Sequence, residues 1–398
     1  MKRIARALPM VIVLVLAGCR GGEEEVMPKF SRGNRLAPRH IPPGRDAPAA
    51  PPKSEWKLPS HLALSDRSLD VSPDRRLAVV WGERGLDTRT RKSCWVLDLQ
   101  TGKIEDLSDG ADEAVAAIIH DTQRASFSPD ATRLLISAEG GESACVVELS
   151  RGEVTLITKP YGVLWVGDRL LFSRSDGKSA ICSVAGEIQE RPNLRGCVIA
   201  SDPSGTKLLL QFPNAAVVSS KGEVLRKFGP ACDRDLPLLS RSGNWAGVFC
   251  AEEDGWGYSL VSTTTDEKLR LARPWGATLA LTDDGDSILP FGGEDNGFLG
   301  LMTGGRPDGP TTTGILFWPK DDEPLNSKEQ DSREERSRDK PPGKSQVIAD
   351  KATAFTVLGK ELFFVQAEGD ERTLRAVPLP QPGASSPATK PPTAREKR

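Results

Sequence analysis

A short phrase recurs along this chain, a polar turn followed by a run of apolar residues. The turn reads Ser-Pro-Asp at residues 72–74 and again at 128–130, and apolar runs follow at 77–80 and 134–136. Weaker copies of the turn lie at residues 166–168, 202–205, 240–243, 282–285 and 358–360. Self-similarity along a chain is the sequence signature of a repeat architecture, so this phrase constrains the fold more than any single segment does.

Each repeat predicts about four short strands. In the second repeat, apolar runs at residues 125–127, 134–137, 144–149 and 153–157 are separated by short segments rich in Gly, Asp and Glu. Tight turns of this composition between apolar runs are typical of β-hairpins. Gly and Pro account for 38 and 31 of the 398 residues, which disfavours long helices.

The spacing of the repeats predicts a ring of small sheets. The second strands begin near residues 77, 134, 170, 208, 246, 288 and 362, and three neighbouring steps lie close to 38 residues. Two longer steps contain insertions: a short helix or loop within 108–122 and an almost wholly polar segment at 321–346. We therefore predict an all-β fold, a β-propeller over residues 56–380, with about seven four-stranded blades favoured and six or eight as alternatives.

The two ends of the repeat region predict how the ring closes. The last repeat has strands near residues 353–357, 361–366 and 373–377, and prolines at 378, 380 and 382 then exclude a regular fourth strand. A spare apolar segment lies at the start of the region, at residues 56–64. We predict that this N-terminal segment supplies the missing strand and closes the ring.

Two stretches carry a resemblance to a known family. The phrase Phe-Ser-Pro-Asp at residues 127–130 and the run at 95–103 resemble the WD-like repeat of TolB-type periplasmic β-propellers. The resemblance covers about residues 60–380 and is clear in the first two repeats. It implies the propeller fold, but the amino-terminal domain and partner-binding peptide of TolB have no counterpart here, so that function is not implied.

Residues 1–18 predict a lipoprotein signal peptide. Basic residues at 2, 3 and 6 precede a short apolar run at 8–16, too short to span a bilayer. The ending Leu-Ala-Gly-Cys at 16–19 resembles the lipobox of bacterial lipoproteins, which implies cleavage before Cys19 and lipid attachment to its thiol. An ordinary secretory signal is the alternative. We expect a lipid anchor in the bacterial cell envelope, facing the periplasm, and Arg20 in place of Asp favours the outer membrane.

The segments on either side of the ring are polar and rich in proline. Residues 19–55 contain two Pro-Pro pairs and a Glu run, and they predict a disordered tether between the lipid and the ring. Residues 381–398 predict a disordered tail.

Six cysteines remain besides Cys19. Three of them, Cys94, Cys145 and Cys182, occupy similar places in third strands, which favours packing as small apolar residues. Cys197 and Cys232 could lie near each other on one face of the ring and form a disulfide in an oxidising compartment.

Two tryptophans, Trp256 and Trp275, are expected in turns, where they could line the rim of a ligand site. Structural packing is the alternative for both.

The sequence contains no known catalytic or metal-binding motif. Its three histidines, at 40, 61 and 120, lie far apart, and neither Cys-x-x-Cys nor Gly-x-Ser-x-Gly occurs. Acidic hairpins at 252–254, 283–286 and 294–295 lack calcium-loop spacing. We predict no cofactor and no metal. A net charge of −2 and 6% aromatic residues also argue against nucleic-acid binding.

These observations favour a binding scaffold without catalysis, presented to another envelope protein or polymer. The alternative is an envelope enzyme, a glycan lyase or hydrolase, with a carboxylate site in the propeller channel. That enzyme would need two or more acidic or basic groups converging at the channel mouth, whereas a channel filled by Leu, Val and Ala would argue against it.

Overall fold

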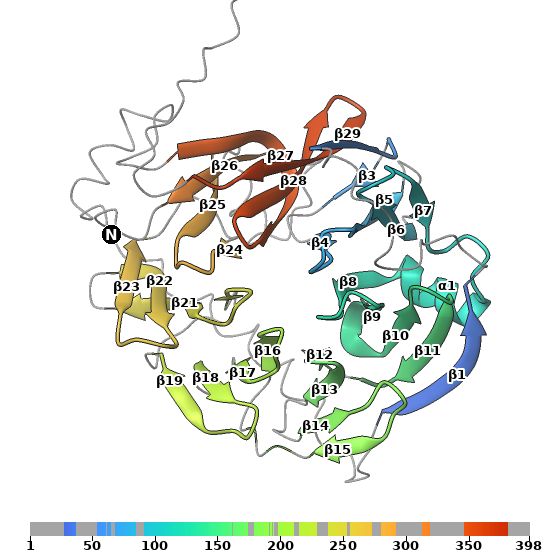
Figure 1. The fold of residues 1–398 in the computed structure, drawn as a ribbon, viewed down its shortest axis with the longest axis horizontal. Coiled ribbons are helices and arrows are strands. Elements are labelled where there is room, and N and C mark those ends of the chain that lie inside the picture. The colour runs from blue at the N-terminus through green and yellow to red at the C-terminus, as the bar shows by residue number, and fades with distance from the viewer. Residues whose placement is uncertain are drawn as a thin grey trace, which may run out of the picture.

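The computed structural model describes residues 28–36, 54–60, 62–64, 68–84, 91–160, 162–173, 179–190, 192, 194, 198–210, 215–228, 238–252, 255–272, 280–291, 313–318 and 346–380. These residues form a ring of antiparallel sheets around a central axis (Figure 1). The prediction of an all-β propeller is confirmed. The described residues also include one α-helix, α1 (Glu113–His120), and one 3₁₀ turn (Glu139–Gly141).

The first two sheets have five strands each. In the first sheet, β3 (Leu62–Ala63) and β4 (Leu69–Val71) both pair with β5 (Leu77–Arg84), followed by β6 (Arg91–Asp98) and β7 (Ile104–Asp106). The second sheet is β8 (Thr122–Phe127), β9 (Arg133–Ala138), β10 (Ser143–Glu148), β11 (Glu153–Thr158) and, on its outer edge, β1 (Lys29–Arg35).

The next three sheets each have four strands in sequence order. The third is β12 (Gly162–Val166), β13 (Arg169–Ser173), β14 (Ser179–Cys182) and β15 (Ile188–Glu190). The fourth is β16 (Val198–Ser201), β17 (Lys207–Leu210), β18 (Ala216–Ser219) and β19 (Val224–Lys227). The fifth is β20 (Leu238–Leu239), β21 (Trp245–Glu252), β22 (Gly255–Ser262) and β23 (Lys268–Ala272).

The sixth sheet contains seven strands, and it corrects the expected number of blades. It comprises β24 (Ala280–Leu281), β25 (Ser287–Phe291), β26 (Thr313–Trp318), β27 (Gln346–Leu358), β28 (Glu361–Glu368), β29 (Glu371–Pro378) and β2 (Glu55–Leu58). Counted as hydrogen-bonded sheets, the ring has six blades, so the favoured count of seven is wrong and the alternative of six holds.

The cause of the miscount is the length of β27. This strand has 13 residues. Its first half pairs with β26, and its second half, from Ala352 onward, pairs with β28. One strand therefore belongs to the last two sequence repeats and joins them in a single sheet. Gln346, which the sequence assigned to the polar insertion, is already the first residue of this strand, and residues 321–345 lie outside the described residues.

The predicted closure by an N-terminal strand is confirmed. β2 pairs with β29, with Glu55 opposite Arg375 and Leu58 opposite Arg372. Trp56 is buried between the sixth and first sheets, and its indole Nε1 donates a 2.9 Å hydrogen bond to the Leu99 carbonyl. The later part of the predicted closing segment does not join the sixth sheet. Its residues Leu62 and Ala63 form β3, which pairs with β5 of the first sheet.

The recurring phrase is a turn held by its own first side chain. Ser72 Oγ accepts a 2.9 Å hydrogen bond from the Leu77 N–H and donates at 2.7 Å to Asp74 Oδ1. Ser128 repeats the arrangement in the second sheet, with Oγ 2.9 Å from the Arg133 nitrogen. Each turn therefore leads the innermost strand of a sheet back into the next strand.

Three of the five weaker copies keep this geometry, two of them with another residue type in the first position. Asp202, Ser240 and Thr282 take the first position, and their side-chain oxygens accept from backbone N–H groups at 2.7, 3.0 and 2.9 Å. At Gly205, the turn also touches its neighbour: a Cβ there would lie 2.7 Å from the backbone nitrogen of Gly167. The turns of adjacent sheets thus interlock.

The apolar faces of adjacent sheets pack to form the core. The three cysteines expected in third strands are buried thiols within it, as predicted: Cys94, Cys145 and Cys182. Burial raises the pKa of the Cys145 thiol to about 12, so this residue is a packing group rather than a nucleophile.

The Ser-Pro-Asp turn makes stability depend on pH. The Asp130 carboxylate accepts from Ser128 Oγ at 2.5 Å and from Thr132 N–H at 3.1 Å. Burial disfavours the charged form, but these hydrogen bonds outweigh it and lower the pKa of Asp130 from 3.8. The stabilisation is therefore present above the unfolded pKa and is lost as the pH falls through the folded pKa.

We expect Asp130→Asn to destabilise the protein near neutral pH by less than about 1 kcal/mol, because the carboxylate is exposed and screened by solvent. Below about pH 4 the difference from the wild type should shrink. Urea denaturation over a pH series measures both. In a Ser128→Ala background the effect of Asp130→Asn should diminish, and a pH-independent difference would contradict the assignment.

Candidate functional site

The outer edge of the second sheet carries a segment that the sequence placed in the tether. We call residues 29–36, which are β1 and the following Leu36, the strap. β1 pairs antiparallel with β11, with Lys29 opposite Thr158 and Arg35 opposite Glu153. The prediction of a disordered tether over 19–55 is therefore wrong for the strap, while residues 19–27 and 37–53 lie outside the described part of the chain.

Two apolar side chains hold the strap at its ends. Phe30 makes an edge-to-face contact with Phe172 of the third sheet, with ring centroids 5.7 Å apart. Gly186 lies against the Phe30 ring so closely that a Cβ there would be 2.6 Å from it. At the other end, Leu36 is 3% exposed and packs into the core between the first and second sheets. The strap thus spans from the third sheet to the first.

Backbone hydrogen bonds reinforce the second of these anchors. The Arg35 N–H donates to Asp112 Oδ2 at 3.1 Å, and Asp112 precedes helix α1. The Leu36 N–H donates to the Gly152 carbonyl at 2.9 Å. The strap is therefore an integral part of the folded ring, held by side-chain packing and by backbone hydrogen bonds.

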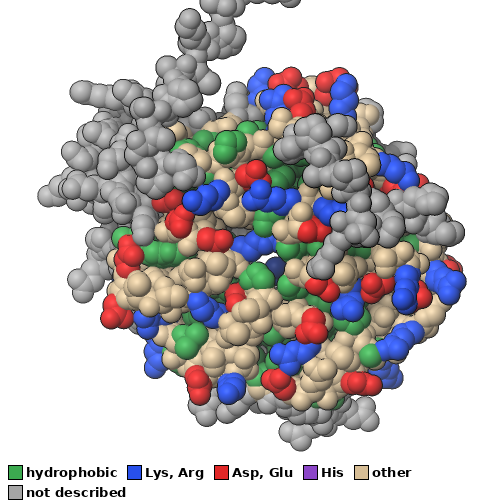
Figure 2. All heavy atoms as spheres, in the orientation of Figure 1, with side chains coloured by type: hydrophobic (Ala, Val, Ile, Leu, Met, Phe, Trp, Pro, Cys, Tyr) green, Lys and Arg blue, Asp and Glu red, His purple; other side chains and the backbone are tan. Residues whose placement is uncertain are grey.

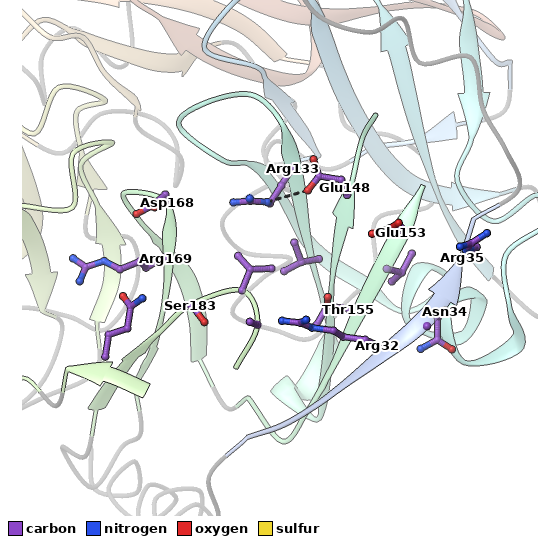
Figure 3. Close-up of a pocket in the computed structure, with 16 residues that line it drawn as sticks. Arg32, Asn34, Arg35, Arg133, Glu148, Glu153, Thr155, Asp168, Arg169 and Ser183 are labelled. Carbon is purple, nitrogen blue, oxygen red and sulfur yellow. Dashed lines mark hydrogen bonds and ion pairs between the residues drawn. The ribbon is translucent and has the colours of Figure 1, made fainter. Parts of the chain in front are cut away.

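A groove of about 550 Å³ lies between the strap and the third sheet (Figure 3). Its charged lining residues are Arg32, Arg35, Arg133, Arg169, Glu148, Glu153 and Asp168. Arg133 Nε pairs with Glu148 Oε2 at 3.1 Å, and Arg169 pairs with Glu190 at 2.5 Å. Neither strap arginine has an ion pair among the described residues, and the same holds for the groove carboxylates Glu153 and Asp168.

A second charged cluster lies at the central axis. Arg241, in the turn between β20 and β21 of the fifth sheet, crosses to the first sheet, where Nη2 donates to the Val71 carbonyl at 3.2 Å. Its Nη1 lies 3.9 Å from Asp70 Oδ1. Asp70 Oδ2 also accepts from the Phe127 N–H of the second sheet at 3.0 Å. Arg124 of β8 reaches the Ile199 carbonyl of the fourth sheet at 3.4 Å. Four sheets therefore meet here through polar side chains.

The Asp70 carboxyl has an altered acidity in this setting. Burial raises its pKa, against the opposing effects of the Arg241 charge and the Phe127 N–H. This cluster at the axis thus brings together one carboxyl group and two arginine guanidinium cations.

Most of the residues singled out from the sequence lie outside the described part of the chain. These are Cys19, Cys197, Cys232 and Trp275. Trp256 was expected in a turn, and this is wrong: its backbone lies in β22, paired with Ala251 of β21. The Gly residues that flank it suggested a turn, but the strand pairs regularly through them.

His120 is the described histidine. It ends α1, and its Nδ1 lies 3.0 Å from the Lys92 carbonyl. Within the described ranges no group of three or more His, Cys, Asp or Glu side chains could hold a metal ion. No helix in the same ranges is long and apolar enough to cross a membrane.

The arginines of both clusters were missed by the sequence interpretation. One signal was visible: the turn at 240–243 has Arg241 where the first two copies have proline. Strap residues Phe30 and Leu36 were the other signal, two apolar residues inside a polar segment. Neither signal indicates by itself which distant sheet the residue contacts.

Phe30→Ala should release the strap while leaving the propeller folded, because the Phe30 side chain makes the strap's contact with Phe172 of the third sheet. We expect faster proteolysis after Lys29, Arg32 and Arg35, with cleavage elsewhere in the chain unchanged from the wild type. Limited trypsin digestion followed by mass spectrometry measures this. Val224→Ala, an exposed apolar residue on β19, is the control and should leave the digestion pattern unchanged.

The solved structures that this chain is similar to share little sequence identity with it. No family model matches the chain, and no curated protein matches it significantly. A chain of the Kuenenia stuttgartiensis hydrazine synthase is 13% identical, with 81% of this chain and 97% of that chain covered and a TM-score of 0.46. The β-propeller domain of the Trilobed protease from Pyrococcus furiosus is 11% identical, with 83% and 97% covered and a TM-score of 0.48. The Myceliophteria thermophila Cps50 (Swd1) propeller domain is 10% identical, with 81% and 99% covered and a TM-score of 0.47.

Proposed function

We propose that this chain is a lipid-anchored scaffold of the bacterial cell envelope, held at Cys19 and presenting its propeller to another envelope protein or polymer without catalysis. The strap is the observation that carries the proposal. It joins the segment that follows Cys19 to the folded ring, so an anchor at that residue holds the whole propeller and not only a loose terminus. The lipobox resemblance at 16–19 and the rigid interlocked ring support the same function.

Lipidation is tested in a bacterial host with the wild type and Cys19→Ser. We expect the wild type to incorporate labelled palmitate and to fractionate with membranes, and Cys19→Ser to do neither. Unlabelled wild-type protein in the soluble fraction would overturn the anchor.

Scaffolding is tested separately with the non-lipidated chain from Arg20 onward, which keeps every described residue. Cross-linking in envelope extracts should enrich a protein or polymer that free competing chain displaces. Failure to enrich any saturable partner would count against the scaffold.

A second function, the envelope enzyme, has one observation in its favour. Asp70 and two arginines converge in the channel, which meets the expectation of converging acidic and basic groups. In this function the two arginines would bind an anionic glycan through their positive charge. Asp70, whose pKa is raised, would transfer the proton. Incubation of envelope polysaccharides with wild type and Asp70→Asn, read by release of reducing or unsaturated ends, separates the two functions: turnover that Asp70→Asn abolishes would favour the enzyme.

A further inference from the structure

We infer that the strap's basic residues contact the anionic headgroups of the membrane that holds the lipid, so that the propeller stands on its edge with the second sheet toward the lipid surface. This inference rests on the proposed anchor at Cys19. It adds a binding surface, a ligand class, which is the phosphate of an anionic phospholipid, and an orientation.

The first argument is the number of residues between Cys19 and the folded ring. Lys29, the first strap residue, is ten residues after Cys19, whereas β2 begins 36 residues after it. An extended chain spans at most about 3.3–3.6 Å per residue, so the strap lies within about 35 Å of the lipid attachment point. Without the strap, the ring could stand more than about 100 Å away. Docking of the strap therefore keeps this edge of the propeller near the membrane.

The second argument is the charge of the strap. Lys29, Arg32 and Arg35 are all exposed, and the strap contains no acidic residue. Figure 2 shows basic side chains, with acidic ones among them, along the part of the rim where Figure 1 draws β1. Acids do lie nearby, with Glu153 opposite Arg35 and Asp168 across the groove, but none is ion-paired with a strap cation among the described residues.

Attraction between a few cations and an anionic surface is individually weak and acts within a Debye length, which is about 8 Å in physiological salt. The anchor changes the outcome, because it holds the strap at high effective concentration beside the headgroups. A contact too weak to recruit the protein is then sufficient to orient it.

The third argument is stiffness. Phe30 and Leu36 fix the strap to the third and first sheets, so a contact made by the strap orients the entire ring. β22 and β23 lie on the opposite side of the ring (Figure 1) and would point away from the lipid. The side presented to envelope partners would therefore be the fifth sheet.

The test uses lipidated mature protein in vesicles of phosphatidylcholine alone, or with about one third phosphatidylglycerol. Lysine acylation is followed by mass spectrometry at exposed lysines: Lys29 on β1, with Lys227 on β19 as the reference and Lys57 on β2 as a second reference. We expect the rate at Lys29, relative to Lys227, to fall about fivefold or more when phosphatidylglycerol is present, and the protection to disappear in high salt.

The variant Arg32→Gln/Arg35→Gln should lose most of this protection and remain with the vesicles. The control Lys221→Gln/Lys227→Gln on the fourth sheet should retain the protection; because it lacks Lys227, exposed Lys57 of β2 is its internal reference. Equal relative labelling of Lys29 in both lipid mixtures, or protection that survives the strap variant, would overturn the inference. Protein that does not associate with vesicles at all would overturn the Cys19 anchor instead. Labelling without vesicles shows whether the variant strap stays docked.

Discussion

Trp56→Ala should lower the free energy of unfolding by about 3–5 kcal/mol, the largest effect expected of any single substitution discussed for this protein. Trp56 is 5% exposed and packs among apolar residues of the sixth and first sheets. Its removal leaves a cavity at the seam where β2 closes the ring, and the Leu99 carbonyl loses its indole partner. Equilibrium unfolding in urea, followed by tryptophan fluorescence and circular dichroism, measures the loss.

Trp56→Phe separates packing from hydrogen bonding at the same seam. It keeps an aromatic ring but removes the donor to Leu99, so we expect a loss of about 1–2 kcal/mol. If Trp56→Ala and Trp56→Phe cost the same, closure would rest on the hydrogen bond and not on burial. A Trp56→Ala loss below about 1 kcal/mol would show that β2 contributes little to the ring.

Gly205→Ala is expected to cost about 2–5 kcal/mol, because two penalties combine at one turn. Gly205 has a φ of +69°, which L residues adopt only with strain. Its Cβ would also lie 2.6 Å from Val166 Cγ1 and 2.7 Å from the Gly167 nitrogen of the third sheet. Because a backbone atom cannot rotate away, the interlocked turns would have to separate. Thermal unfolding and urea denaturation measure this loss.

Gly140→Ala is the matched control for the conformational cost of a positive φ. Gly140 has a φ of +77°, and a Cβ at this residue would have nothing within 4 Å, so only the conformational strain of about 1–2 kcal/mol applies. The difference between the two variants therefore reports the contact between turns. Equal losses would mean that neighbouring turns do not support each other.

The repeat fold could be predicted because its determinants are local. Ser72 and Ser128 hold the turn within five residues, and the same geometry persists where Asp202 or Thr282 replaces serine. Ring closure was predictable for a different reason: prolines after residue 377 left one strand missing, and the segment around Trp56 was apolar and unassigned. Both features are visible from composition and order alone.

The candidate sites could not be predicted because their contacts are between distant sheets. Nothing near Arg241 in the sequence indicates that it reaches Val71, 170 residues away. The strap illustrates the same limit, since a proline-rich segment gives no periodicity from which to predict pairing with β11. The blade count failed at β27, where one continuous strand serves two repeats that the spacing had counted separately.

The closing strand has a consequence for how the protein is made. β2 finds its partner in β29, and Arg372 Nε donates at 3.3 Å to the Leu62 carbonyl, 310 residues earlier in the chain. Contacts so distant in sequence form slowly, because a very long loop must close before they are made. During synthesis, moreover, β29 exists only after nearly the whole chain has been made. Until then the edge of β2 is unpaired and the Trp56 indole has no core to enter. A nascent chain therefore exposes β2 and Trp56 from the start of synthesis and buries them last, so this seam is the segment that a holding chaperone would have to shield.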